Sequence, residues 1–109
     1  MFRRRMIIST TDKIPGKEIG EILDVVKGST VRVKNLGVDI GAGLKSLIGG
    51  EVKVYTEISE QARDEALNRM INSAIKLNAD AVIGVRFSTS MIMKGASEML
   101  AYGTAVKFK

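Results

Sequence analysis

Four stretches of this chain show the apolar patterns of β-strands. Residues 6–9 form a short apolar run, and residues 17–34 are rich in Ile and Val at both parities, which is typical of a strand covered on both faces in places. A bulge or bend is expected within it at Gly28-Ser29. Residues 81–93 and 98–108 alternate between apolar and polar or small side chains. The pattern therefore predicts four strands, two toward each end of the chain.

Two stretches between these strands have the spacing of amphipathic helices. In residues 35–48 apolar side chains recur every four residues, which predicts a first helix. Glycines within this stretch weaken the prediction, and Gly49–Gly50 is expected to end the helix. Residues 51–56 are expected to be an extended connection, and residues 57–77 have the firmest helical pattern. The order β-β-α-α-β-β predicts an α+β domain with two helices on an antiparallel sheet.

Small residues line one face of the last predicted strand. Ala101, Gly103 and Ala105 lie opposite its larger apolar side chains, so a helix or a neighbouring subunit is expected to pack very close to them. Gly37 and Gly41 are four residues apart in the first predicted helix, where they would let that helix approach a neighbour closely. We expect these five residues to form close-packing contacts.

The composition fits one globular domain and removes several kinds of chemistry. The chain has 109 residues, of which 45% are apolar and 27% charged. It contains no Cys and no His, which excludes disulfides, zinc fingers, thiol nucleophiles and imidazole bases. No segment reaches the roughly 18 consecutive apolar residues of a membrane span. We expect a cytoplasmic protein that does not enter a membrane.

The positive charge is concentrated at the beginning of the chain. The formal net charge is +5, from 17 basic and 12 acidic residues, and without Arg3, Arg4 and Arg5 the balance is 14 − 12 = +2. We expect residues 1–5 to be a disordered basic arm and residues 6–109 to be the single domain. Weak, non-specific nucleic-acid binding through the arm is one alternative function. Nucleic acid is nevertheless not an expected partner, because no aromatic-rich basic face accompanies the arginines.

Four motifs follow one another in a specific order along the chain. They are Ser9-Thr10-Thr11 before a Pro-Gly turn, residues 39–44 followed by Gly49-Gly50-Glu51, residues 79–85, and residues 103–107. Together they resemble the YbjQ-like family of small uncharacterised proteins, sometimes labelled "putative heavy-metal-binding". The resemblance implies an α+β subunit that assembles as a homopentamer arranged like a β/α propeller. It implies no established activity.

Three methionines are the weak metal candidates of the chain. Met91, Met93 and Met99 flank one predicted hairpin, and Met91 and Met93 are expected to share a face. Soft metals bind thiolate, imidazole or thioether, and only thioether is available here, so a Cu(I) site is conceivable on these residues. Methionine in the apolar register of strands is more often packing.

Five polar residues are candidates for a ligand site or a subunit interface. Asp39, Glu51 and Tyr55 lie around the ends of the first predicted helix, where a cluster of them could bind a cation or transfer protons. Lys45 and Arg86 are candidates for an anion pocket or for the channel of a ring. Arg86 would alternatively pair with an acid across a subunit boundary, a structural task that suits arginine.

The leading hypothesis is a non-catalytic, homo-oligomeric binding module or scaffold with a ligand or metal site at subunit interfaces. An enzyme that uses carboxylates and Tyr55 is the second hypothesis, and binding through the arginine arm is the third. The expected partner is the chain itself. The sequence identifies no catalytic residue, no cofactor and no specific small ligand.

Overall fold

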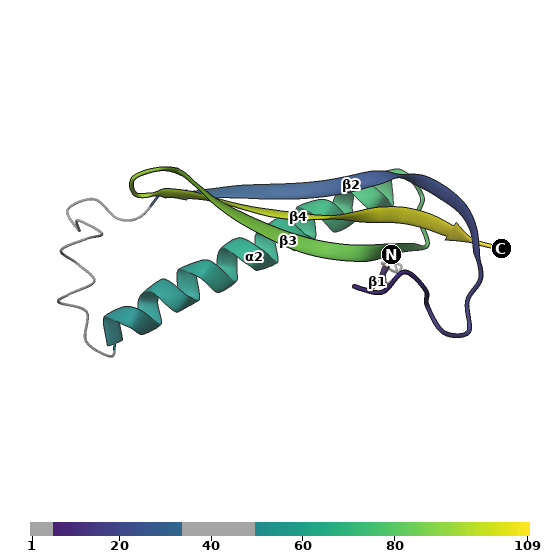
Figure 1. The fold of residues 1–109 in the computed structure, drawn as a ribbon, viewed down its shortest axis with the longest axis horizontal. Coiled ribbons are helices and arrows are strands. Elements are labelled where there is room, and N and C mark those ends of the chain that lie inside the picture. Colours follow the sequence, from purple (N-terminus) through teal and green to yellow (C-terminus); the bar gives the residue numbers. More distant parts are fainter. Residues whose placement is uncertain (1–5, 34–49) are drawn as a thin grey trace, which may run out of the picture.

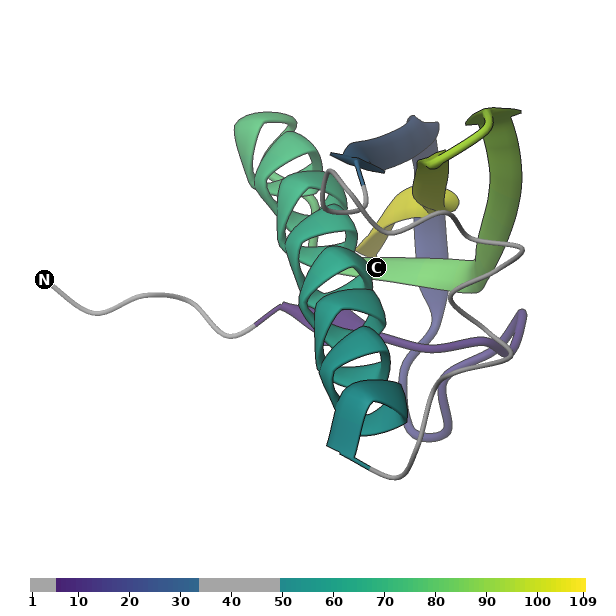
Figure 2. The ribbon, with the colours of Figure 1, turned by 90° about the vertical axis from the view of Figure 1, so that its left-hand side faces the viewer.

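The computed structural model describes residues 6–33 and 50–109 of the chain. Its elements are β1 (Ile7–Ile8), β2 (Ile19–Val33), α2 (Gly50–Lys76), β3 (Ala81–Met93) and β4 (Ala96–Phe108). The long strands form one twisted sheet, and α2 crosses one of its faces (Figure 1). Viewed along the long axis, helix and sheet form two layers (Figure 2). The α+β class predicted from the sequence is confirmed.

The sheet is mixed and has four strands in the order β1-β3-β4-β2. β4 pairs antiparallel with β2 on one side and with β3 on the other, whereas β1 pairs parallel with β3. The predicted antiparallel sheet is therefore correct for the three long strands and wrong for β1. A two-residue strand has too short a pattern to fix its direction, which depends on where the chain enters the sheet.

The helix begins earlier than predicted. Residues 51–56 were expected to be extended, but α2 runs without interruption from Gly50 to Lys76. Lengthening an existing helix adds one hydrogen bond for each residue fixed, and this outweighs the short local pattern. The described residues contain one helix in the order β-β-α-β-β, not the predicted β-β-α-α-β-β. The first predicted helix, residues 35–48, lies outside the described residues.

The end of α2 is a Schellman motif. Asn78 has a φ of 59°, a left-handed conformation that asparagine adopts at helix ends more readily than most other residues. The Asn78 N–H donates to the carbonyl of Ile75 at 2.9 Å, and the Ala79 N–H donates to that of Ala74 at 3.1 Å. These bonds satisfy carbonyls at the end of the helix and turn the chain directly into β3.

The helix backbone lies directly on β2 at Gly28. A Cβ atom placed on Gly28 would lie 2.3 Å from the carbonyl oxygen of Ala66 and 2.4 Å from the backbone nitrogen of Met70. The partner of Gly28 on β4 is Ala101, so the sheet offers no bulky side chain at this crossing. Pairing is regular through Gly28 and Ser29, so the strand has no bulge there, which was one of the two features predicted, a bulge or a bend. Close approach of α2 is the reason for this glycine.

The small-residue face of β4 packs against α2 of the same chain. Ala101 and Ala105 are fully buried and belong to a core cluster that includes Ala66 and Ala74 of the helix. Gly103 is crowded from β3 instead, because a Cβ there would lie 2.7 Å from Val82 Cγ1. Of the two expected partners for this face, a helix and a neighbouring subunit, the structure shows the helix.

The contact at Gly28 predicts a specific effect on stability. Gly28→Ala should lower the free energy of unfolding by about 3 kcal/mol, because α2 must move off the sheet to admit one methyl group. Urea denaturation at one fixed protein concentration measures this loss. Gly20→Ala in the same strand is the control, since its new Cβ meets Lys109 near the chain end, at 3.0–3.2 Å. Equal losses for the two variants would contradict the close contact.

Candidate functional site

Of the five polar candidates from the sequence, the structure describes the side chain of Arg86 alone. Four candidates lie outside the described residues: Gly37, Asp39, Gly41 and Lys45. Glu51 and Tyr55 lie in the first turns of α2, where the structure describes the backbone but not the side chains. The carboxylate–tyrosine cluster therefore stays a prediction.

Arg86 connects β3 to the segment that follows β1. Its Nη1 donates a hydrogen bond to the carbonyl of Thr10 at 2.8 Å and another to the carbonyl of Val85 at 2.9 Å. The side chain is exposed. The described contacts of Arg86 therefore hold a loop in place, which is a structural task of the kind considered for this residue, although the partners are carbonyls instead of an acid.

A bulge in β3 receives the same loop. Gly84 has a φ of 61°, and the register shifts between Ile83 and Arg86, so that Gly84 and Val85 together oppose one residue of β4. The freed N–H groups of Gly84 and Val85 donate to the carbonyls of Thr11 and Ser9, each at 3.0 Å. Two motifs that lie more than 70 residues apart in the sequence thus meet at one edge of the sheet.

The hydroxyl groups of this loop satisfy one another. The Thr11 hydroxyl donates to the carbonyl of Lys13 at 2.6 Å, and its oxygen lies 2.5 Å from the hydroxyl oxygen of Ser9. Because Thr11 has one proton and it is already used, Ser9 must be the donor in that contact. Both hydroxyls therefore take part in holding the turn.

The hairpin methionines are separated by a register shift. Met91 pairs with Ser97 and Met93 pairs with Ala96, so Ile92 is an extra residue on β3. Successive residues of β4 point to opposite faces, and the alternation that would place both thioethers on one face is interrupted. The register shift therefore gives no support to the prediction that Met91 and Met93 share a face. Both side chains are exposed.

Met99 is held apart from these two residues. It is partly buried against the core, and its sulfur accepts a hydrogen bond from the Thr89 hydroxyl at 3.4 Å. The hairpin gives no support to a site formed by all three thioethers. In the part of the chain that the structure describes, no group of three or more Asp, Glu, His or Cys residues could hold a metal ion.

The face of the sheet opposite α2 brings together residues that sequence reasoning missed. Tyr102 of β4 pairs with Lys27 of β2 on one side and with Arg86 of β3 on the other. Their side chains share one face, and it is not the helix face, because Gly28 and Ala101 in the next row contact α2. The register between distant strands creates this row, so no spacing within the sequence signals it.

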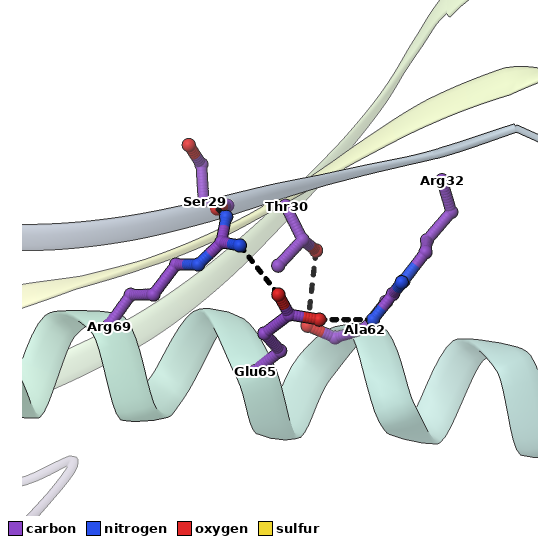
Figure 3. A network of polar contacts seen from close by, with 6 residues as sticks. All are labelled: Ser29, Thr30, Arg32, Ala62, Glu65 and Arg69. Atoms are coloured by element: carbon purple, nitrogen blue, oxygen red, sulfur yellow. Dashed lines mark hydrogen bonds and ion pairs between the residues drawn. The ribbon is translucent and has the colours of Figure 1, made fainter.

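A second missed feature is an ion-pair network between α2 and β2 (Figure 3). The Glu65 carboxylate accepts hydrogen bonds from Arg32 of β2 and, at 2.5 Å, from Arg69 one helical turn away. Arg69 also donates to the carbonyl of Ser29 at 2.5 Å. The i, i+4 spacing of Glu65 and Arg69 was a usable signal for half of this network. The contact with Arg32 depends on the crossing of helix and strand.

A buried hydrogen bond lies beside the ion pairs. The Thr30 side chain, 3% exposed, donates from its hydroxyl to the carbonyl of Ala62 at 3.2 Å (Figure 3). Because a buried hydroxyl without a partner is costly, this bond favours one position of α2 along β2.

The described helix, α2, is not both long and apolar enough to cross a membrane.

The role of Arg86 can be measured by hydrogen exchange. Arg86→Ala removes the bond to the Thr10 carbonyl, so the loop should open more often and the Gly84 and Val85 amides should exchange about five-fold faster. Arg63→Ala, an exposed position on α2, is the control and should leave these amides unchanged. Unchanged exchange in the Arg86 variant would show that the loop is held without it.

The network around Glu65 predicts a salt-dependent loss of stability. Glu65→Gln should lower the free energy of unfolding by about 1 kcal/mol at low ionic strength, since two partly exposed ion pairs are lost. The loss should shrink in about 1 M salt because screening weakens the pairs in the parent chain. Asp64→Asn, at the exposed neighbouring position, is the matched control in urea denaturation. An equal loss in that control would contradict a specific role for Glu65.

A solved structure of similar fold comes from Pediococcus pentosaceus. It is described as a protein of unknown function that belongs to the DUF74 family, and it aligns with a TM-score of 0.68 at 20% identity. The alignment covers 95% of this chain and 98% of that chain. At this identity the likeness supports the fold alone.

Sequence relatives match over almost the whole chain. A UPF0145 protein of Archaeoglobus fulgidus is 58% identical over 108 residues, which are 99% of this chain and 100% of the relative. A UPF0145 protein of Methanoculleus marisnigri is 60% identical and covers 94% of this chain and 95% of its own length. The family model described as "Putative heavy-metal-binding" matches residues 6–109. This chain therefore belongs to the YbjQ-like family of uncharacterised proteins.

Proposed function

We propose that this chain is a non-catalytic, homo-oligomeric binding module or scaffold with a ligand site at its subunit interfaces. The main support is the set of large apolar side chains that α2 leaves uncovered. Exposed fractions are 54% for Val31 on β2, and 72%, 56% and 64% for Met91, Ile92 and Met93 on β3, all toward the β3–β4 hairpin end of the sheet. Clustered apolar exposure of this kind marks an interaction surface.

The sheet also has two unlike edges that are open in the described part of the chain. β2 pairs only with β4, and β3 pairs only with β4 after the bulge at Val85. Unpaired strand edges favour pairing with another chain. A contact between two different surfaces of identical subunits is called heterologous. Repeated contacts of this kind form a closed ring when the rotation from one subunit to the next divides a full turn into equal parts. The homopentamer implied by the family resemblance is one such ring.

The family label adds a metal to the ligands worth testing. Heavy metals prefer soft donors, and a chain without Cys or His offers only its six methionines in that class. A Cu(I) titration followed by mass spectrometry is therefore the appropriate metal experiment. Stoichiometric binding that Met91→Leu and Met93→Leu remove would place the metal on the hairpin.

Self-association is tested by native mass spectrometry of protein purified without added metals or nucleotides. The expected species is a pentamer, and retained extra mass would identify a ligand. Ile92→Lys should weaken assembly at least ten-fold, because a charge would enter an apolar contact. Asn72→Lys on the exposed side of α2 adds the same charge and should not. A monomeric parent chain would contradict the proposed function, and an unchanged Ile92 variant would remove the hairpin from the interface.

A further inference from the structure

The open face of the sheet has an aromatic ring at the centre of a row of cations. Tyr102 is 38% exposed, and both Lys27 and Arg86, its partners on the flanking strands, are exposed. Neighbouring strands are about 4.8 Å apart, which places the two cationic residues about 10 Å from each other across the tyrosine. The ring therefore has a cationic residue on the strand to each side, and the guanidinium of Arg86 lies toward the Thr10 carbonyl on the β1 side of β3.

The rows next to this one contain no acidic residue. Val25, Thr104 and Ile83 form the row on one side, and Ser29, Leu100 and Ser88 form the row on the other. These three rows are therefore apolar and hydroxyl-bearing apart from the two cations, and the nearest acidic residues are Glu98, one row further out, and Asp12, beside Gly84. Without the three N-terminal arginines the formal balance is 14 − 12 = +2, so the rest of the chain adds only a slight long-range attraction for polyanions.

Arg86 keeps donors for a ligand while it holds its loop. Both described hydrogen bonds of its side chain come from Nη1, and a guanidinium group carries five N–H donors. Those bonds also restrict where the guanidinium lies, so less side-chain freedom would be lost on binding. Lys27 has no such restraint among its described contacts and would act as a mobile point charge.

We infer that this row is a docking platform for single-stranded nucleic acid, with one base stacked on Tyr102 and the adjoining phosphates at Lys27 and Arg86. Aromatic side chains on open sheet faces bind bases by stacking, and flanking cations bind the backbone. A nucleotide within a strand has a phosphate on both sides of its base, which matches cations on both sides of the ring. A mononucleotide would use one cation only, so the two-sided arrangement favours the strand.

This inference gives the proposed binding module a ligand class and in that sense rests on the proposed function, although it requires no particular number of subunits. It differs from binding through the arginine arm, because the folded sheet supplies all three residues. It also differs from a second copy of the chain on this face, which would cover Tyr102 and prevent strand binding.

The test is fluorescence anisotropy of a labelled ten-nucleotide oligo(U) titrated with the full chain over a range of salt concentrations. Tyr102→Leu should weaken binding about ten-fold because it removes the stacking ring, whereas Tyr102→Phe should bind like the parent chain. Lys27→Gln should reduce the slope of log K against log salt by about 0.7, the value for one phosphate contact of a single strand. Lys76→Gln, in the last turn of α2, removes one charge from the other layer and should leave the slope unchanged.

Three results would overturn the inference. The first is no binding by the parent chain at about 50 mM salt, where phosphate contacts are strong. The second is equal affinity of Tyr102→Leu and Tyr102→Phe for oligo(U), together with equal slopes of log K against log salt for Lys27→Gln and Lys76→Gln. The third is displacement of labelled oligo(U) by uridine monophosphate at the same nucleotide concentration at which unlabelled oligo(U) displaces it. That result would assign the row to a mononucleotide. Native mass spectra of the same samples report assembly separately, so an intact oligomer that does not bind oligo(U) contradicts this inference alone.

Discussion

The direct contact between the backbone of α2 and β2 at Gly28 is the constraint on which the rest of this structure depends. The helix touches the strand without an intervening side chain, so its backbone lies closer to β2 than a residue with a Cβ at position 28 would allow. Ala66 and Met70 are fully buried as a result. The same position brings Glu65 opposite Arg32 and places the Thr30 hydroxyl at the Ala62 carbonyl. One glycine thus permits both the apolar core and the polar network beside it.

The sequence predicted what depends on local pattern. The two C-terminal strands, the helix over residues 57–77 and the α+β class were all expected from spacing alone. The start of α2 and the direction of β1 were predicted wrongly, because helix extension and strand direction are decided by the rest of the fold. The glycine at position 28 was recognised as special, but its reason lies in a helix forty residues further along the chain.

The candidate site illustrates the same limit more strongly. Arg86 was singled out from its charge, yet its contact with Thr10 and its position beside Tyr102 depend on pairing between segments far apart in sequence. Lys27 and Tyr102 carry no motif of their own. Residue type suggests which chemistry is available, whereas strand register decides which residues meet. A chain without Cys or His makes this limit severe, because the residues that usually mark a site are absent.

The strand pairing also determines when this protein can fold during synthesis. Ile19, at the start of β2, pairs with Phe108, one residue before the end of the chain. β2 reaches its partner strand only when β4 has left the ribosome, and β1 must likewise wait for β3. Contacts between such distant positions slow folding and leave apolar strands exposed in the meantime. β1 and β2 are therefore the strands that most need protection from aggregation until β3 and β4 have been made.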